Sequence, residues 1–197
     1  MLPIQQFQNW SFRQVNDLAR ATDWLHAPLR VWAEYGVVLF AVLLLAGWWR
    51  ARGTADPVRI ATALWAPLGM LLAIGINQPI GNLIAERRPY DVLHHVLVLV
   101  PRSTDFSFPS DHAVMAGAVA TGLWWVDRRL GLVAALAAVA MAFARVYVGA
   151  HYPLDVVAGL ALGALVTSLG LLAARPLVVR LVLALQRTRL RPLLSTA

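Results

Sequence analysis

The sequence contains no cysteine and no lysine. The absence of cysteine excludes disulfides, thiolate metal sites and a cysteine nucleophile. Because lysine is missing, all 17 basic residues are arginines, and against 10 acidic residues they give a formal net charge of +7. Hydrophobic residues make up 59% of the chain, compared with about 45–50% in a soluble domain. This composition favours a membrane protein, in which arginines face the cytoplasm and anionic lipid, over a nucleic-acid-binding protein.

Five apolar runs are bounded by charged segments, at 31–49, 59–85, 110–126, 130–148 and 153–174. A helix that crosses the bilayer core needs about 20 apolar residues. The third run reaches that length only if it begins at the polar residue Ser110. The sequence thus predicts an all-α, polytopic membrane helix bundle with five spans. A sixth span at the C-terminus is possible, although Arg180 argues against it.

The hydrophobic composition predicts a single membrane-embedded domain over 1–197. The opening segment, 1–30, shows no signal peptide, and residues 5–25 form an amphipathic pattern that predicts a helix lying at the membrane interface. The core covers 31–174. The basic C-terminal segment, 175–197, is expected to be an interfacial helix or an extension of the fifth span.

Arginines are distributed unevenly between the two predicted membrane faces. Ten lie on one side: Arg50, Arg52, Arg59, Arg128, Arg129, Arg175, Arg180, Arg187, Arg189 and Arg191. Positive residues are enriched in cytoplasmic loops, so this side is predicted to be cytoplasmic. The opening segment and the long connection 87–109 are then predicted to face outward.

Three polar segments fall at predicted helix ends on that outward side. They are "AERRPY" (85–90), "SFPSDH" (107–112) and "ARVYVGAHYPLD" (144–155). A charge near the bilayer centre costs at least about 2.5–3.5 kcal/mol, so such residues gather in pairs or at aqueous sites. Each segment alone is common in structural roles, as a helix cap or a stop signal. Their occurrence together on one side favours a functional site.

The third segment predicts an oriented histidine. Pro153 suits the first turn of a helix, which places His151 just before the fifth span and Asp155 four residues later. An aspartate there can accept a hydrogen bond from one imidazole nitrogen and leave the other free as a nucleophile or base.

The other residues around this histidine predict a phosphate-binding site. Ser110 is a plausible N-cap, and the first amides of the helix after it can bind an anion. Arg88 and Arg145 add guanidinium groups that suit phosphate oxygens, and His112 supplies a second imidazole. Because no HExxH or comparable ligand pair occurs, no metal is predicted.

These segments resemble the signature of the type 2 phosphatidic acid phosphatase superfamily. That signature is a lysine seven residues before Arg-Pro, then Pro-Ser-Gly-His, then Ser-Arg, five residues, His, three residues and Asp. The counterparts here are Arg88-Pro89, Pro109 to His112, and Ala144-Arg145 through His151 to Asp155. Within the superfamily the chain is most similar to the bacitracin-resistance type of undecaprenyl-diphosphatase, which shares the "FPSDH" form, an early Glu34-Tyr35 pair and Asn77.

Three positions depart from the superfamily pattern. Gly81 stands at the lysine position, Asp111 replaces the glycine and Ala144 replaces the serine. Candidates to compensate for the lysine are Arg87, Arg102 and Asn77.

The resemblance implies a role for each site residue. His151 would attack the terminal phosphorus, Asp155 would hold its tautomer, and His112 would protonate the leaving oxygen. Arg88, Ser110, Arg145 and Asp111 would bind the phosphate, with Glu34 as an auxiliary residue. No metal or other cofactor is implied.

The predicted function is dephosphorylation of undecaprenyl or another polyprenyl diphosphate at the outward face of the bacterial inner membrane. The resemblance implies that the reaction would recycle the lipid carrier for cell wall synthesis and would contribute to bacitracin resistance. The expected partners are the lipid and the membrane, with no nucleic acid. One alternative is a phosphatase for a lipid monoester such as phosphatidylglycerol phosphate or phosphatidate. Another is a non-catalytic lipid-phosphate binder or transporter, but binding alone requires arginines and not an oriented histidine.

Overall fold

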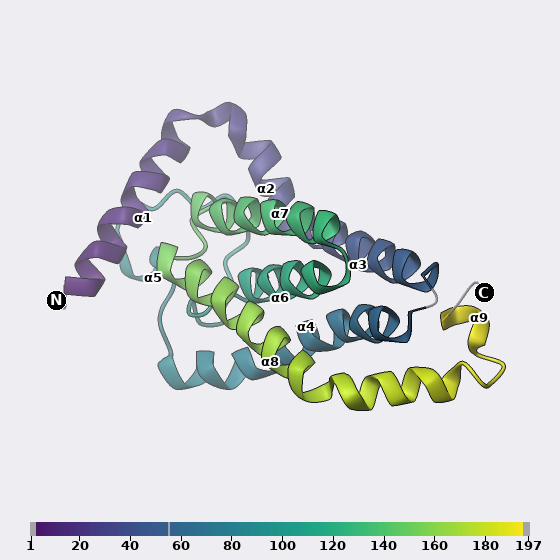
Figure 1. Cartoon of the computed structure of the whole chain (residues 1–197). Helices are drawn as coiled ribbons and strands as arrows, with labels where there is room; N and C mark the ends of the chain where they lie inside the picture. Colours follow the sequence, from purple (N-terminus) through teal and green to yellow (C-terminus); the bar gives the residue numbers. More distant parts are fainter. Residues whose placement is uncertain (1–2, 55, 195–197) are drawn as a thin grey trace.

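The computed structural model describes residues 3–54 and 56–194, and the regular elements within these ranges are helical (Figure 1). This agrees with the predicted all-α membrane bundle. The elements are α1 (Pro3–Ala21), η1 (Asp23–Leu25), α2 (His26–Tyr35), α3 (Val37–Arg52), α4 (Pro57–Ile84), α5 (Pro89–Val92), α6 (Asp111–Val126), α7 (Arg128–Tyr147), α8 (Pro153–Leu185) and α9 (Arg191–Leu194).

Helices α4, α7 and α8 are each long and apolar enough to cross a bilayer. A fourth span is possible if η1–α2 and α3, which meet at an angle of 51°, cross together. The third predicted run, 110–126, corresponds to α6, whose 16 residues extend about 24 Å at a rise of about 1.5 Å per residue. That is short of a bilayer core of about 30 Å. Helices α3, α4, α7 and α8 all contact α6, so it lies at the centre of the bundle.

Close packing of α8 against α6 aligns the starts of the two helices. A Cβ atom on Gly163 would lie 2.1 Å from the carbonyl oxygen of Val114, and one on Gly159 would lie 2.8 Å from that of Ser110. Only glycine permits this approach. The amide of Ser110 can therefore donate to the carbonyl of Asp155 at 3.1 Å. Gly159 and Gly163 thus serve packing of α8 on α6 within the chain.

The C-terminal segment continues the fifth span. Helix α8 runs unbroken for 33 residues with Pro176 and Arg180 inside it, and Figure 1 shows it changing direction part-way along its length. Of the two structures predicted for 175–197, an extension of the span is therefore present as far as Leu185. Residues 195–197 of that segment lie outside the described residues.

The long connection between α4 and α6 folds back over the turn between α7 and α8. The amide of Leu99 donates to the carbonyl of Val148 at 3.0 Å. Gly149 has φ +82°, and a Cβ there would lie 2.4 Å from the carbonyl oxygen of Leu97. This position requires glycine for both its conformation and its space. The turn that carries His151 is thus fixed against the connection.

Candidate functional site

A cavity of about 210 Å³ lies at the end of the bundle where α6 and α8 begin, and it is called the catalytic cavity below. It brings together residues from all three polar segments identified in the sequence. Its lining residues are Arg88, Ser103, Asp105, Phe106, Pro109, Asp111, His112, Arg145 and His151. The segments are far apart in the sequence, so the tertiary fold is what assembles them.

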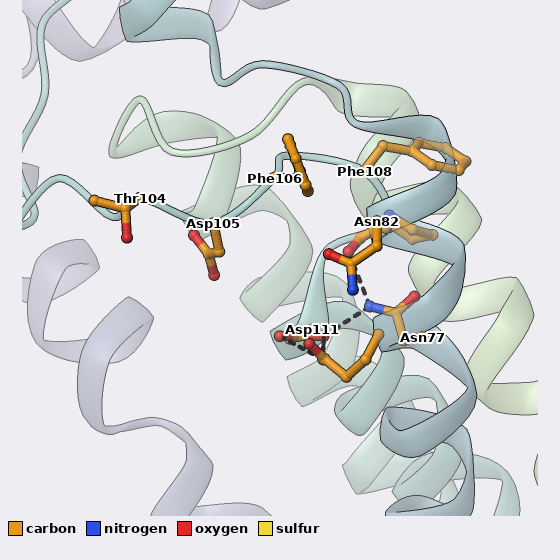
Figure 2. A pocket seen from close by; sticks show the side chains of 10 residues that line it. Asn77, Asn82, Thr104, Asp105, Phe106, Phe108 and Asp111 are labelled. Atoms are coloured by element: carbon orange, nitrogen blue, oxygen red, sulfur yellow. Dashed lines mark hydrogen bonds between the residues drawn. The ribbon is translucent and has the colours of Figure 1, made fainter.

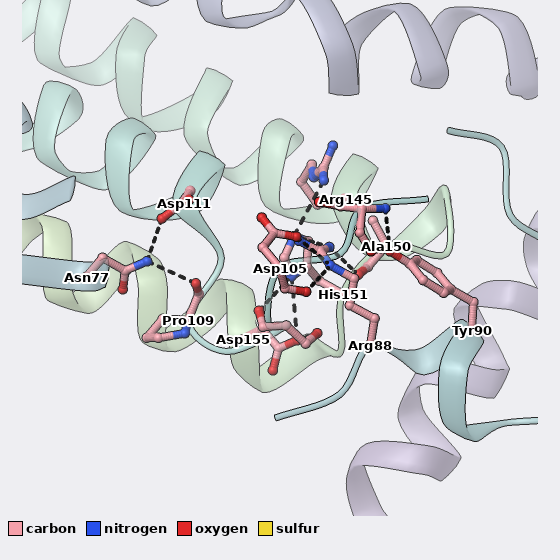
Figure 3. A network of polar contacts seen from close by, with 12 residues as sticks. Asn77, Arg88, Tyr90, Asp105, Pro109, Asp111, Arg145, Ala150, His151 and Asp155 are labelled. Carbon is pink, nitrogen blue, oxygen red and sulfur yellow. Dashed lines mark hydrogen bonds and ion pairs between the residues drawn. The ribbon is translucent and has the colours of Figure 1, made fainter. Parts of the chain in front are cut away.

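His151 is 2% exposed and is held at both ring nitrogens (Figure 3). Its Nδ1 lies 2.8 Å from the carbonyl oxygen of Ser107, whereas the Asp155 carboxylate is 3.6 Å away. A carbonyl can only accept, so Nδ1 carries the proton and donates to Ser107. The lone pair is then on Nε2, which lies 3.2 Å from Nη1 of Arg88 and 3.5 Å from Nη2 of Arg145.

Asp155 is fully buried and supports the histidine partly through Ser107. Its Oδ2 accepts hydrogen bonds from the Ser107 hydroxyl at 2.5 Å and from the Tyr152 amide at 2.8 Å. The sequence predicted a direct hydrogen bond from His151 to Asp155, but the closest acceptor is the Ser107 carbonyl. Sequence reasoning missed Ser107 because the bond uses a backbone group that every residue has.

The environment of His151 favours its neutral form. Burial, followed by the positive charges of Arg145 and Arg88, lowers the pKa of His151 well below its ordinary value of 6.5, against the opposing effect of the Ser107 hydrogen bond. An imidazole that is neutral at physiological pH retains a lone pair on Nε2 for nucleophilic attack.

Arg88 connects the histidine to a carboxylate that the sequence analysis did not single out. Its Nη1 donates to the carbonyl of Ala150 at 2.9 Å, and its Nη2 and Nε bind Oδ1 of Asp105 at 2.6 and 3.1 Å. Burial would raise the pKa of Asp105, but hydrogen bonds from Ser103 and Arg88 and the charge of Arg88 lower it. Asp105 is therefore an anion, and it occupies the edge of the Arg88 guanidinium at which a phosphate oxygen could bind.

Arg145 is 8% exposed and forms no ion pair with the residues that the structure describes. Its Nε has no hydrogen-bond partner, and its Nη1 is 3.4 Å from the carbonyl of Ala33, which precedes the predicted auxiliary Glu34. A buried guanidinium with unused donors favours binding of an anion. The catalytic cavity offers that anion a place beside His151.

The start of α6 presents a free hydroxyl and an imidazole. Ser110 is the N-cap residue, as predicted, but its side chain makes no capping bond, and its buried Oγ has no partner in the described part of the chain. His112 lies in the first turn and lines the catalytic cavity. Asp111 instead accepts hydrogen bonds from Asn77 at 2.6 Å and Gln78 at 3.0 Å. The contacts of Asp111 suit positioning of α6 against α4 better than direct phosphate binding.

The position of the missing lysine opens into a second cavity of about 200 Å³ (Figure 2). Gly81 lines it, and none of its lining residues is basic. The side chain of Arg87 donates to the Asp91 carbonyl at 3.2 Å, and that of Arg102 lies 5.3 Å from the centre of the Tyr90 ring. Neither arginine lines either cavity, so their compensating role is not supported by these contacts. The second cavity shares Asp105, Phe106, Pro109 and Asp111 with the catalytic cavity.

Comparison with known proteins identifies the family. The model of the PAP2 superfamily matches residues 62–177, which include all three polar segments. The chain belongs to the PAP2 superfamily. Members of this superfamily are phosphatases, and the predicted resemblance is confirmed.

Two curated PAP2 relatives cover most of the chain. The bacitracin transport permease protein BcrC of Bacillus licheniformis is 30% identical over 155 residues, which are 79% of this chain and 74% of that protein. The undecaprenyl-diphosphatase BcrC of Bacillus subtilis is 31% identical over 149 residues, which are 76% of this chain and 75% of that protein.

Two solved PAP2-like structures share the fold. LpxE of Aquifex aeolicus has a TM-score of 0.57 at 25% identity and covers 81% of this chain and 92% of its own. The transmembrane PAP2-type phosphatidylglycerolphosphate phosphatase of Bacillus subtilis has a TM-score of 0.59 at 20% identity and covers 86% and 85%. The protein is thus a multi-pass membrane member of a phosphatase family.

Proposed function

We propose that this PAP2 protein hydrolyses undecaprenyl diphosphate, or another polyprenyl diphosphate, to the monophosphate and inorganic phosphate. The observation that carries the proposal is the orientation of His151, whose proton is held on Nδ1 while Nε2 faces Arg88 and Arg145. A protein that only bound phosphate would need the two arginines but not the buried histidine. The names of the BcrC relatives support the diphosphate as substrate.

The first step forms a phosphohistidine. Nε2 of His151 attacks the terminal phosphorus and the bridging P–O bond breaks, so the lipid monophosphate leaves with the electron pair. His112 donates a proton to the leaving oxygen. Arg88 and Arg145, which line the catalytic cavity, stabilise the oxygens of the transferred group, and the buried Ser110 hydroxyl, which has no partner among the described residues, adds a donor at the start of α6.

The second step returns the enzyme to its starting state. His112, now neutral, takes a proton from a water molecule that attacks the phosphorus of the intermediate. The N–P bond breaks, inorganic phosphate leaves, and the lone pair returns to Nε2 of His151. The guanidinium groups supply the positive field throughout, so the proposed reaction needs no metal.

The proposed location is the bacterial inner membrane with the catalytic cavity on the extracytoplasmic side. The arginine-rich ends of α3, α7 and α8 lie away from the cavity, and positive residues favour the cytoplasm. In that orientation the product would be returned to the carrier lipid pool for cell wall synthesis.

The test is phosphate release from undecaprenyl diphosphate by detergent-purified protein in excess EDTA. We expect release from the wild type and a loss of at least about 1,000-fold in the rate of release by His151→Ala. Without the nucleophile, substrate binding and stabilisation of the phosphate oxygens would supply only a residual acceleration of about 10³–10⁴ over the reaction in water. Protein quenched during turnover of substrate labelled in the terminal phosphate should carry acid-labile label in the wild type. Loss of activity in EDTA that magnesium restores would refute the metal-free mechanism.

A parallel assay with lipid monoesters separates the other functions. Phosphatidylglycerol phosphate and phosphatidate are the appropriate probes, since one structural neighbour is named as a phosphatidylglycerolphosphate phosphatase. Faster turnover of a monoester would replace the proposed substrate. Binding of every lipid without phosphate release would instead favour a transporter or binding protein.

A further inference from the structure

Helix α1 has three distinct faces. One is packed on the protein and contains Gln8, Phe12, Asn16 and Ala19, which are all buried. A second is polar and exposed and contains Gln6, Arg13 and Asp17. A third is apolar and exposed and contains Ile4, Phe7, Trp10 and Leu18, whose exposed fractions are 59, 53, 60 and 44%. At about 100° per residue, these four fall within a sector of about 120°, which also contains the exposed polar residue Gln14.

The apolar face of α1 is followed along the chain by further exposed apolar and aromatic side chains. Trp24 of η1 is 76% exposed, and Val31 and Tyr35 of α2 are 52 and 65% exposed. Helix α2 then leads into α3, with which it forms the bent candidate span. Exposed tryptophan and tyrosine are typical of the bilayer interface. Because these exposed residues lead directly into a candidate span, they favour a lipid surface as the occupant of the apolar face.

The packed face of α1 holds the segments that build the catalytic cavity. The Gln8 side chain donates to the carboxylate of Glu86 at 3.1 Å, two residues before Arg88. The ring of Phe12 packs edge-on against Tyr152, next to His151, with 5.7 Å between ring centres.

A second contact fixes the long connection. The Asn16 side chain accepts from the Leu97 amide at 3.0 Å and donates to the Leu97 carbonyl at 2.9 Å. Further along the helix, Arg20 donates to the carbonyl of His95. Gly149 in turn packs on Leu97, so this contact reaches the turn that carries His151.

We propose that α1 lies in the bilayer interface through Ile4, Phe7, Trp10 and Leu18 and that this insertion stabilises the catalytic loops through Gln8 and Asn16. Lipid on one face and the loops on the opposite face would together fix the helix. Displacement of α1 from the bilayer would therefore loosen the connection at Leu97. The membrane contact does not depend on the proposed reaction, whereas its effect on catalysis does.

The membrane contact is tested with single cysteines, because the chain has none of its own. Phe7→Cys and Arg13→Cys proteins would carry an environment-sensitive fluorophore in vesicles of phosphatidylethanolamine and phosphatidylglycerol. We expect shallow spin-labelled lipids to quench the label at position 7, and aqueous iodide to quench the label at position 13. Equal access of iodide to both labels would overturn the proposal. Neither result requires enzymatic activity, so failure of the proposed function would be recognised separately.

The link to the loops is tested by hydrogen exchange in the same vesicles. Phe7→Glu places a charge on the apolar face, and Gln6→Glu places the same charge one residue away on the polar face. Neither residue lines the catalytic cavity. We expect at least fivefold faster exchange of the Leu97 amide in Phe7→Glu and no change in Gln6→Glu. Unchanged exchange of the Leu97 amide in Phe7→Glu would refute the coupling.

Discussion

Removal of the Ser107 hydroxyl should separate support of the histidine from phosphate binding. In Ser107→Ala the carbonyl that accepts from His151 remains, but Oδ2 of Asp155 keeps only the Tyr152 amide as a hydrogen-bond donor. A hydrogen bond to a charged group contributes about 1.5–3 kcal/mol. Asp155 retains its place 3.6 Å from the His151 ring. We therefore expect Ser107→Ala to lose transition-state stabilisation near the lower end of that range, about 1.5 kcal/mol.

The expected result is a decrease of about 10-fold in kcat, since about 1.4 kcal/mol corresponds to one factor of ten. KM should change little, because Ser107 is absent from the lining of the catalytic cavity. The assay is the initial rate of phosphate release from undecaprenyl diphosphate in detergent. Thermal unfolding of each variant serves as the control for folding.

A double-mutant cycle with Asp155→Asn decides whether Ser107 acts through Asp155. If it does, the double variant should be little slower than Asp155→Asn alone, because the shared interaction is removed only once. Fully additive losses would refute the reasoning, as would a wild-type kcat in Ser107→Ala.

Three further predictions concern charge and packing. Asp105→Asn removes the carboxylate that occupies the edge of Arg88, so the inhibition constant of inorganic phosphate should fall about fivefold, or about 1 kcal/mol; a higher constant would show that Asp105 assists binding. Burial, followed by the charge of Asp155, raises the pKa of Glu86 from 4.5 to about 7. The folded protein holds this proton more tightly, so the associated stability is fully present below pH 4.5 and is lost as the pH rises through 7. Glu86→Gln should reduce the fall in Tm over that interval, and an unchanged profile would contradict the assignment. Gly163→Ala should cost about 1–3 kcal/mol because its Cβ would meet Val114, whereas Gly75→Ala, with nothing within 4 Å of its Cβ, should not lower Tm.

The sequence by itself determined which segments are helical and which residues gather at one end of the bundle. Long apolar runs interrupted by charge are sufficient to predict the helical segments, because the bilayer penalises exposed polar groups along every stretch of chain. The predicted run 153–174 begins at the observed first residue of α8, and 59–85 lies within three residues of α4. The spacing of the motifs that contain Arg88, Ser110, Arg145 and His151 was sufficient to predict that these residues gather at one end of the bundle.

Only the tertiary structure decided how the proposed catalytic groups are held. The acceptor for His151 is a backbone carbonyl at Ser107, and the partner of Arg88 is Asp105 in an irregular part of the long connection. Both depend on the path of that connection, which carries no repeating pattern from which its course could be predicted. The packing of α1 on Leu97 is of the same kind, because it joins residues 81 positions apart. Local sequence patterns specify helices and motifs, whereas contacts between distant segments arise only when the whole chain has folded.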